Sequence, residues 1–345
     1  MNFYFLKRVF CQRISGAGLF RLIWPFSSDL LRFINNNKVK GIALRRYIWL
    51  SVFILLSCHF ERPEKIQLGT NVWPGYEILY LAREKSYFDE LDIKLVEYRS
   101  ASQVIDGLQN GVLDMAALTL DEAIKVVAGG IPLKVILIFD ISDGADAIVA
   151  RAGIDSFEKL KGKKVGIEQS ALGAFIFRRF LEKRALNPED FKLAGLDINH
   201  QLEAIERGQV DAVVTFEPVK SKILRRGGHV LFDSREIENE IIDVLVVSEA
   251  GLEKIGEQRL QTFIKQYWRA ASAFLNAPQK SFPLINKRLK LSPDELAQAY
   301  EQIHIPSISE QLAIMEDEAM GPATAIMVSQ LLREMGLIDS ACNSP

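Results

Sequence analysis

The chain has 345 residues, more than one hydrophobic core usually serves, and an ordinary globular composition of 48% hydrophobic and 25% charged residues. Its charge is divided unevenly: residues 1–57 hold nine Lys or Arg and one acidic residue, whereas residues 58–345 hold 33 basic and 43 acidic residues. An acidic body argues against nucleic acid as a partner, because phosphates require a positive surface. A basic, apolar leader before an acidic body is typical of a targeting segment followed by a soluble protein.

The leader, residues 1–57, has the features of a lipoprotein signal peptide. Arg45 and Arg46 precede an apolar run of 11 residues, 47–57, which is too short for the about 20 residues that span a bilayer. The following "LLSC" resembles the bacterial lipoprotein box, which implies that Cys58 is lipidated and becomes the new N-terminus. We therefore expect a periplasmic or extracytoplasmic protein held to a bacterial membrane by a lipid anchor. The alternative is a buried cysteine within a membrane anchor.

Residues 1–38 form an unusually long lead for a signal peptide. One hypothesis is a misassigned start, with translation beginning at a non-Met codon such as that of Val39. The other is an aromatic, basic arm on the membrane surface. Residues 58–64 then form a short polar tether, and Cys11 and Cys342 predict no disulfide.

From residue 65 onward, predicted strands alternate with predicted helices. Apolar, β-branched segments predict strands at 65–70, 91–98, 113–119 and 133–140, and amphipathic segments predict helices at 76–88, 101–111 and 120–130. This order favours a mainly parallel, doubly wound α/β sheet. Beyond residue 250 the pattern is helical, with Ser292 as the N-cap before Pro293 in one of the helices.

The chain also repeats itself at an offset of 97 residues. The matching pairs are Gly69 and Gly166, Gly111 and Gly208, and Asp114 and Asp211. Turn glycines and strand starts recur in all α/β proteins, so coincidence is one account, but the repeat favours two similar lobes. We expect crossover strands at 144–153 and 241–248. Lobe one would then comprise 65–147 plus 245–345, and lobe two 148–244.

Four segments in order carry a resemblance to a known family: "GTNVWPGYEILYLAREKSYF", "NGVLDMAALTLDEA", "LKGKKVGIE" and "RGQVDAVVTFEP". They resemble the periplasmic solute-binding proteins of ABC importers, in the branch for nitrate, taurine, alkanesulfonates and thiamine-pyrimidine precursors. The resemblance implies the type II periplasmic-binding-protein fold, with two doubly wound sheets joined by two crossover strands and a helical C-terminal region. It also implies a monomer without cofactor or metal, which captures a small solute between its lobes and delivers it to a permease and its ATPase.

In such sheets the ligand lies beyond the carboxyl ends of the strands, where helix N-termini offer free N–H groups. The candidates in the first lobe are Trp73, Tyr76, Glu77, Thr119, Asp121, Ser142, Asp143 and Asp146. Those in the second lobe and on the returning crossover are Gln169, Ser170, Gly173, Thr215, Glu217 and Asp243. Simpler roles stay open: Asp121 and Glu217 could only cap helices, Trp73 could cover the core, and Ser142 with Asp143 could form a turn.

These turns hold aromatics and carboxylates and almost no cations. Aromatic faces beside acids suit an organic cation or an amine-bearing heterocycle rather than a sulfonate or nitrate, which would need Arg, Lys or bare N–H groups. The same fold also serves as an enzyme, for instance in a menaquinone-biosynthesis branch. The four histidines, at 59, 200, 229 and 304, have no ligand spacing, and no catalytic motif is present. We therefore predict a binding protein, with the enzyme and a ligand-sensing protein as alternatives.

Overall fold

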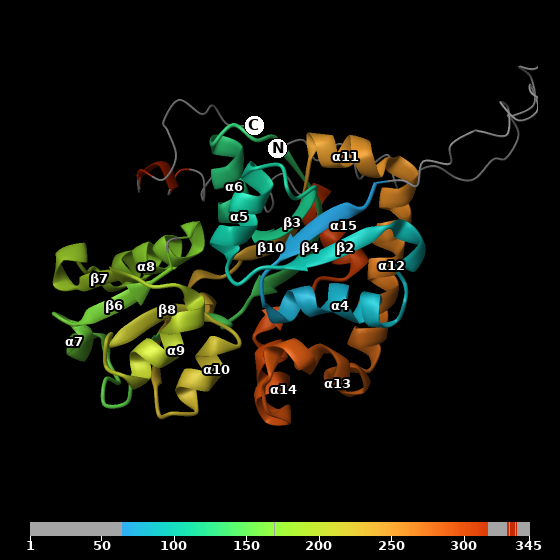
Figure 1. Ribbon diagram of the computed structural model, residues 1–345. Coiled ribbons are helices and arrows are strands. Elements are labelled where there is room, and N and C mark those ends of the chain that lie inside the picture. Colours follow the sequence, from blue (N-terminus) through green and yellow to red (C-terminus); the bar gives the residue numbers. More distant parts are fainter. Residues whose placement is uncertain (1–63, 169, 317–329, 331, 335, 337–345) are drawn as a thin grey trace, which may run out of the picture. The chain divides into compact units, whose positions relative to one another are not determined.

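The computed structural model describes residues 64–168, 170–316, 330, 332–334 and 336 (Figure 1). The predicted signal peptide, Cys58, most of the tether and Gln169 lie outside these residues. All of the described elements belong to one compact unit. Among them, no helix has the length and apolar character needed to cross a membrane.

The first sheet has six strands in the order β11-β4-β10-β3-β1-β2. Its strands are β1 (Ile66–Thr70), β2 (Ile93–Glu97), β3 (Met115–Thr119), β4 (Leu133–Ser142), β10 (Ile242–Ser248) and β11 (Ile303–His304). The helices between the first four strands are η1 (Pro74–Tyr76), α4 (Glu77–Glu84), η2 (Asp89–Leu91), α5 (Ala101–Gln109) and α6 (Leu120–Ala128).

The second sheet has five strands in the order β7-β6-β8-β5-β9. Its strands are β5 (Asp146–Ala150), β6 (Lys164–Ile167), β7 (Lys192–Gly195), β8 (Ala212–Phe216) and β9 (His229–Asp233). Its helices are α7 (Phe157–Leu160), α8 (Ala171–Arg184), η3 (Pro188–Asp190), α9 (Ile198–Glu206), α10 (Val219–Leu224) and η4 (Ser234–Ile237).

The C-terminal region is helical, as the sequence predicts. Its helices are α11 (Glu249–Ile255), α12 (Glu257–Asn276), α13 (Pro278–Leu289), α14 (Pro293–Glu301) and α15 (Ile308–Glu316). Ser292 caps α14: its Oγ accepts a hydrogen bond from the Glu295 N–H (3.3 Å), and the Glu295 carboxylate accepts one from the Ser292 N–H (2.8 Å). This capping box satisfies two N–H groups that a helix start leaves free.

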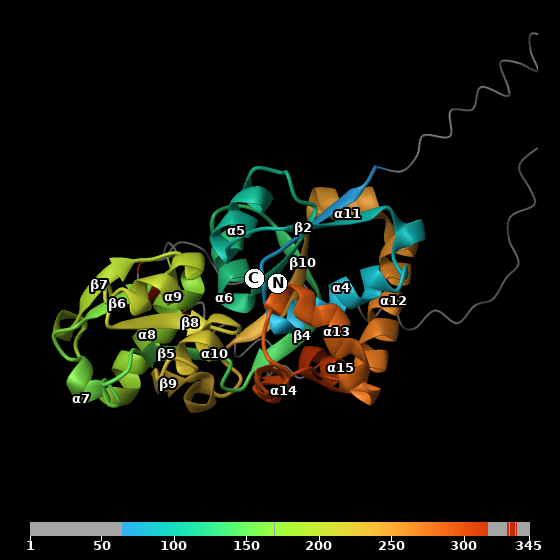
Figure 2. The same cartoon turned by 60° about the horizontal axis from the view of Figure 1, so that its bottom comes forward.

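The two faces of the first sheet are covered by different helices. Along β10, Leu245 and Val247 point to the core beneath α4 and α12, whereas Val244 and Val246 point to the core beneath α5 and α6. This alternation is what a strand with both faces buried requires. Figures 1 and 2 show α5 and α6 on one side of the sheet and α4 and α12 on the other.

The repeat at an offset of 97 residues is visible in the hydrogen bonds of the two sheets. Asp114 Oδ2 accepts from the Gln67 N–H (2.7 Å), and Asp211 Oδ2 accepts from the Lys164 N–H (3.0 Å), 97 residues later. Strand β1 is parallel to β3 with Leu68 opposite Met115, and β6 is parallel to β8 with Val165 opposite Ala212. The two lobes are therefore built on the same frame.

The predicted mainly parallel order holds for the direction of β1–β4 and of β6–β9, but the two strands that cross between the sheets run the opposite way. Strands β1, β2 and β3, and likewise β6, β7 and β8, pair in parallel, but β10 is antiparallel to β3 and β4, and β5 is antiparallel to β8 and β9. The physical reason is that β5 and β10 enter their sheets directly from the other sheet, without a crossover helix to restore direction. The chain passes between the sheets at 143–145 and at 238–241, beside the two predicted crossover segments.

Candidate functional site

A small cavity lies where elements of the two sheets meet. Its volume is about 20 Å³, which is room for about one water molecule. Its lining comes from β-strand ends and the first turns of helices on both sheets, as expected for ligand sites of this architecture. The lining residues are Asn71, Trp73, Tyr76, Ala101, Thr119, Glu122, Asp146, Leu172, Phe216 and Asp243.

The turn before α4 supplies two aromatic rings that carboxylates hold in place. Trp73 Nε1 donates to Asp140 Oδ2 (3.0 Å), and the Tyr76 hydroxyl donates to Asp243 Oδ1. Gly75 makes this arrangement possible, because a Cβ at that position would lie 1.7 Å from Asp140 Oδ2. The glycine of this turn is thus required for the approach of a carboxylate.

The aromatic face of the cavity comes from both sheets. Trp73, from the first, meets Phe216, at the end of β8, edge to face, with ring centroids 5.9 Å apart and planes at 78°. Both rings line the cavity. Edge-to-face packing of this kind stabilises the approach of two elements beyond simple burial.

Two aspartates occupy matching places in the two sheets. Asp243, at the start of β10, lies opposite Thr119, the last residue of β3. Asp146, at the start of β5, lies opposite Phe216, the last residue of β8. Both side chains are buried and both line the cavity. Each lobe therefore brings one carboxylate to the same place through the same strand pairing.

Glu122 is the third acid of the lining. Its Oε2 accepts from the Thr119 N–H (3.1 Å) at the start of α6, while its Oε1 has no hydrogen-bond partner within the described part of the chain. Asp146 Oδ2 is likewise unpartnered there, although Asp146 is only 1% exposed and Glu122 only 2%. Buried carboxylate oxygens without partners are costly and point to an absent partner.

The environment disfavours ionisation of these acids. Burial raises the pKa of the Glu122 and Asp243 carboxyls well above their usual range. The charges of Asp121 and Glu168 raise the pKa of Glu122 further, and those of Asp140 and Asp146 raise the pKa of Asp243 further. Burial also raises the pKa of Asp146 to about 7, although a hydrogen bond with Ser142 opposes this. The Tyr76 hydroxyl lowers the pKa of Asp243 but does not outweigh burial.

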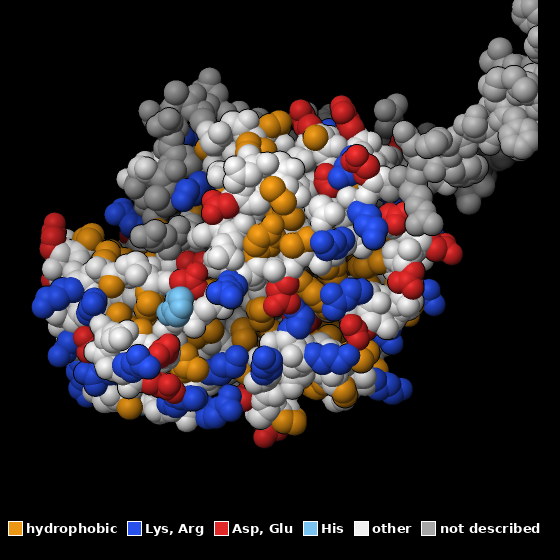
Figure 3. Space-filling view, in the orientation of Figure 1, with side chains coloured by type: hydrophobic (Ala, Val, Ile, Leu, Met, Phe, Trp, Pro, Cys, Tyr) orange, Lys and Arg blue, Asp and Glu red, His pale blue; other side chains and the backbone are white. Residues whose placement is uncertain are grey.

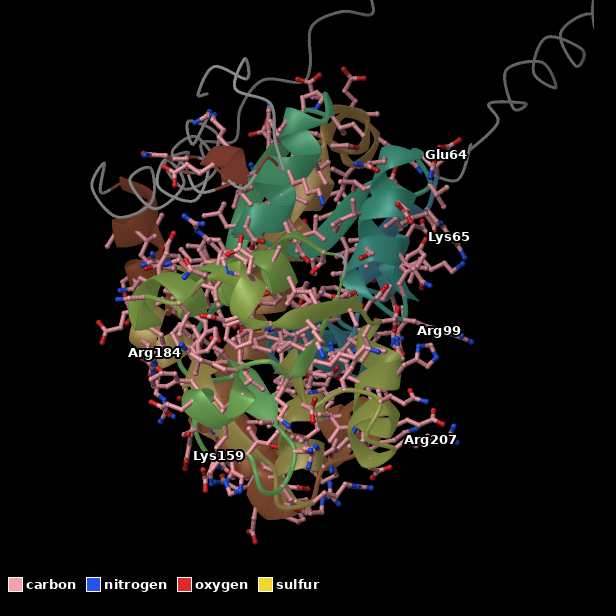
Figure 4. The ribbon with its side chains drawn as sticks, turned by 90° about the vertical axis from the view of Figure 1, so that its left-hand side faces the viewer. Glu64, Lys65, Arg99, Lys159, Arg184 and Arg207 are labelled. Carbon is pink, nitrogen blue, oxygen red and sulfur yellow. The ribbon has the colours of Figure 1, made fainter. Side chains whose placement is uncertain are left out.

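Lys and Arg are absent from the lining, although they are common on the surface. Figure 3 shows blue and red side chains interspersed over one face of the molecule, and Figure 4 places Arg99, Lys159 and Arg207 at its periphery. The site thus combines stacking rings and carboxylates, a set suited to a cationic or amine-bearing group.

The structure brings five of the predicted site residues together around the cavity: Trp73, Tyr76, Thr119, Asp146 and Asp243. Another eight, all described below, lie outside its lining. Gln169 lies outside the described residues. The assignment of all of them to ligand binding stays a prediction.

Three of the eight are buried acids. Glu77 is fully buried and forms an ion pair with Arg288. Glu217 accepts hydrogen bonds from the Ser221 hydroxyl (3.0 Å) and N–H (3.2 Å) in α10. Asp121 is buried in the first turn of α6, where burial raises its pKa to about 6. The last two positions match the simpler capping role that the sequence leaves open.

The other five are small or turn residues. Ser142 Oγ and Ser234 Oγ share a hydrogen bond (2.8 Å), and Asp143 is exposed, with its N–H bonded to the Gln302 carbonyl (2.8 Å). Ser170 Oγ accepts from the Gly173 N–H (3.3 Å) as the N-cap of α8. Thr215 is buried within β8.

Sequence reasoning missed Asn71, Ala101, Glu122 and Phe216 in the lining, and Asp140 beneath Trp73. A signal existed for two of them. Glu122 stands three residues after Thr119, the spacing of a capping box, and Phe216 ends the "VDAVVTF" strand that the repeat aligns with β3. Asp140, inside an apolar strand, carries no local signal.

Sequence relatives include proteins with two kinds of name. A Bacillus subtilis (strain 168) protein named for the binding of aliphatic sulfonates is 26% identical over 203 residues, which cover 54% of this chain and 60% of that relative. The 4-amino-5-hydroxymethyl-2-methylpyrimidine phosphate synthase THI13 of Saccharomyces cerevisiae is 23% identical over 251 residues, 66% of this chain and 73% of that one. The chain thus spans less than two thirds of the first relative's length.

Solved structures share the fold. The alkanesulfonate-binding protein SsuA of Xanthomonas axonopodis pv. citri, bound to MOPS, aligns with a TM-score of 0.66 at 17% identity over 81% of this chain and 95% of that one. The periplasmic aliphatic sulphonate binding protein SsuA of Escherichia coli aligns with a TM-score of 0.63 at 21% identity over 81% and 94%. These likenesses confirm the predicted periplasmic-binding-protein fold. Residues 73–281 match the NMT1/THI5 like family, and the chain belongs to that family.

Proposed function

We propose that this protein is the substrate-binding lipoprotein of an ABC importer, which captures a small organic solute between its two lobes and delivers it to a permease and its ATPase. The observation that carries the proposal is the cavity lined from both sheets by aromatic rings and carboxylates. The family match and the fold of SsuA-type neighbours support it. The leader and Cys58 support a periplasmic location and a lipid anchor, and the family resemblance supports a monomer.

The solute that the site supports best is an organic cation or an amine-bearing heterocycle. Three carboxylates and three aromatic residues line the cavity, and no Lys or Arg does. A sulfonate in the same place would meet Glu122, Asp146 and Asp243 instead of the cationic donors that anions require. We therefore assign this chain a solute unlike those in the names of its sulfonate-binding relatives.

Capture requires the lobes to separate. A volume of about 20 Å³ is too small for an organic solute. The chain passes between the sheets only twice within the described residues, at 143–145 and 238–241, so a hinge at these two passages opens the cavity with little disturbance of either sheet. The solute favours the closed state by touching both lobes at once.

The enzyme alternative rests on the relative named as a pyrimidine phosphate synthase. The three described histidines, His200, His229 and His304, are exposed and lie outside the cavity lining. The fold shared with solute-binding neighbours favours a binding role over a synthase. A sensor would use the same cavity, and neighbouring genes for a permease and an ATPase separate it from an importer.

The test begins with the chain purified without refolding and mass spectrometry of the small molecules released from it. We expect a nitrogen-containing organic solute that raises the melting temperature on re-addition. Trp73→Leu should weaken its binding by about 10- to 100-fold, because the stacking face is lost. Trp268→Leu is the matched control, since Trp268 is buried in α12 away from the cavity. Conversion of the solute to a product, or equal binding by both variants, would contradict the proposal.

A further inference from the structure

The three carboxylates of the cavity reach it from three separate elements. Glu122 comes from α6, Asp146 from β5 and Asp243 from β10, and all three are at most 2% exposed. Like charges this close in a desolvated site cannot all be ionised without a compensating cation. The lining supplies none.

The charged groups packed around each acid also disfavour its ionisation. Glu122 has Asp121 and Glu168 as its charged neighbours. Asp243 is faced by Asp140, Asp146 and Glu122, together with the Tyr76 hydroxyl. Asp146 is faced by Asp121 and Glu217. Lys220 is the one cation among these neighbours of the three acids. Its Nζ donates to the Gly144 carbonyl (2.5 Å) and to the Gln302 side chain, so it is already engaged outside the cavity.

Two carboxyl oxygens of the lining indicate the chemistry of the ligand. Glu122 Oε1 and Asp146 Oδ2 are buried, belong to lining residues and have no partner within the described residues. A protonated carboxyl tolerates this state better than a carboxylate, because it carries no uncompensated charge. A bound cation would satisfy both oxygens as carboxylates.

Resting on the proposed solute-binding function, we propose that the site works by exchange: with the lobes closed and the cavity empty, protons are stored on its acids, and at least one of them is released when a cationic solute is bound there instead. The raised pKa of Asp146, about 7, lies in the range where this exchange responds to ambient pH. Binding then strengthens as pH rises, because fewer protons need to be displaced. For one proton exchanged, the Kd increases about tenfold for each pH unit below that pKa.

The first experiment uses the empty protein and follows melting temperature between pH 5 and pH 8. An acid whose pKa is raised by folding contributes stability that is present at low pH and lost as pH rises through the folded value. We therefore expect the melting temperature to fall across this range, and to fall less in Asp146→Asn. Asp155→Asn, which makes the same carboxylate-to-amide change at an exposed site, should behave as wild type. Glu122→Gln replaces Asp146→Asn if that variant does not fold.

The second experiment uses three fixed probes at up to tens of millimolar: choline, its uncharged isostere 3,3-dimethylbutan-1-ol, and ethanesulfonate. Calorimetry in buffers of different ionisation enthalpy counts the protons released. We expect choline to bind more tightly at pH 8 than at pH 5 and to release protons on binding. At pH 8 the isostere should bind more weakly than choline, and its affinity should not depend on pH.

Three results would overturn the exchange: equal pH slopes for wild type and the cavity variants, no advantage of choline over its isostere, or preferred binding of ethanesulfonate. Each of these leaves solute capture standing if the purified chain still releases a solute. Turnover of that solute would instead remove the binding-protein proposal and leave the exchange intact.

Discussion

The two lobes share a frame but differ in the turn that follows the matching strands β1 and β6. In the first lobe this turn holds Trp73, Gly75 and Tyr76, tied by hydrogen bonds to Asp140 and Asp243. In the second, 97 residues later, Ser170 caps α8 and Leu172 stands where the first lobe has Gly75. The hydrogen bonds of Asp114 and Asp211 are the same in both. The frame is thus duplicated, while the chemistry of the site is concentrated in one lobe's turn.

The largest difference between the turns is a buried ion pair. Glu77 begins α4 and is paired with Arg288, whose side chain is 12% exposed and stacks over the Tyr80 ring at 3.5 Å. The matching position in the second lobe is Ala174. The first turn therefore depends on a C-terminal helix, α13, in a way that the second does not.

Arg288→Met should cost about 3–5 kcal/mol of unfolding free energy at pH 9, because it leaves an ionised Glu77 buried without its cation. Burial raises the pKa of Glu77 to about 8, and Arg288 opposes that rise. Without Arg288 the pKa rises further, so the loss should be greater at pH 9, where wild-type Glu77 is ionised, than at pH 6. Denaturant unfolding at the two pH values measures this.

Lys287→Met is the control for that change. Lys287 pairs with Glu84 on the same side of the molecule, but its side chain is 59% exposed. Such a pair contributes about 0–1 kcal/mol. An equal loss for the two variants would mean that the ion pair of Glu77 does not distinguish the first lobe.

Gly75→Ala should have the next largest effect, about 1–3 kcal/mol from overpacking. The added methyl group would displace Asp140 from Trp73, since it would lie 1.7 Å from Asp140 Oδ2. Solute affinity should fall together with stability, and the environment of Trp73 should change in fluorescence. Leu172→Ala, at the matching place, also changes the cavity lining but should leave the hydrogen bond between Trp73 and Asp140 in place. A Gly75→Ala variant with wild-type fluorescence would contradict the role of Asp140.

The frame was predictable because it rests on local and repeated signals. The offset of 97 residues located two pairs of glycines and one pair of aspartates. Gly111 and Gly208 lie two residues after the ends of α5 and α9, with φ of +67° and +63°, a conformation that favours glycine. The capping box at Ser292 and Glu295 also follows from sequence spacing alone. These features involve residues close in the chain or copies of one pattern.

The site was only partly predictable because its contacts are distant in sequence. Position after a strand pointed to Trp73 and Tyr76, which line the cavity, but it could not separate a carboxylate that faces the cavity from one that caps a helix, as Glu217 does with Ser221. Asp140 is 67 residues from Trp73 and lies inside an apolar strand. Burial and pairing decide these roles, and neither can be read from a short segment.

The smallest expected effect tests the frame itself. Asp211→Asn should cost about 1 kcal/mol, since Asp211 accepts from the Lys164 N–H and pairs with Arg151 (3.0 Å) at a partly exposed site. Although burial opposes it, these contacts hold the pKa of Asp211 below its usual range. Its contribution is therefore present above about pH 4 and lost as pH falls through the lowered folded-state pKa, so the two proteins should converge in stability at acid pH. Asp114→Asn is the matched change in the first lobe, where Lys254 takes the place of Arg151. Denaturant unfolding should give similar losses of unfolding free energy for the two variants at pH 7, because a duplicated frame contributes equally in both lobes. A loss confined to one variant would show that the two lobes share the geometry of this contact but not its contribution to stability.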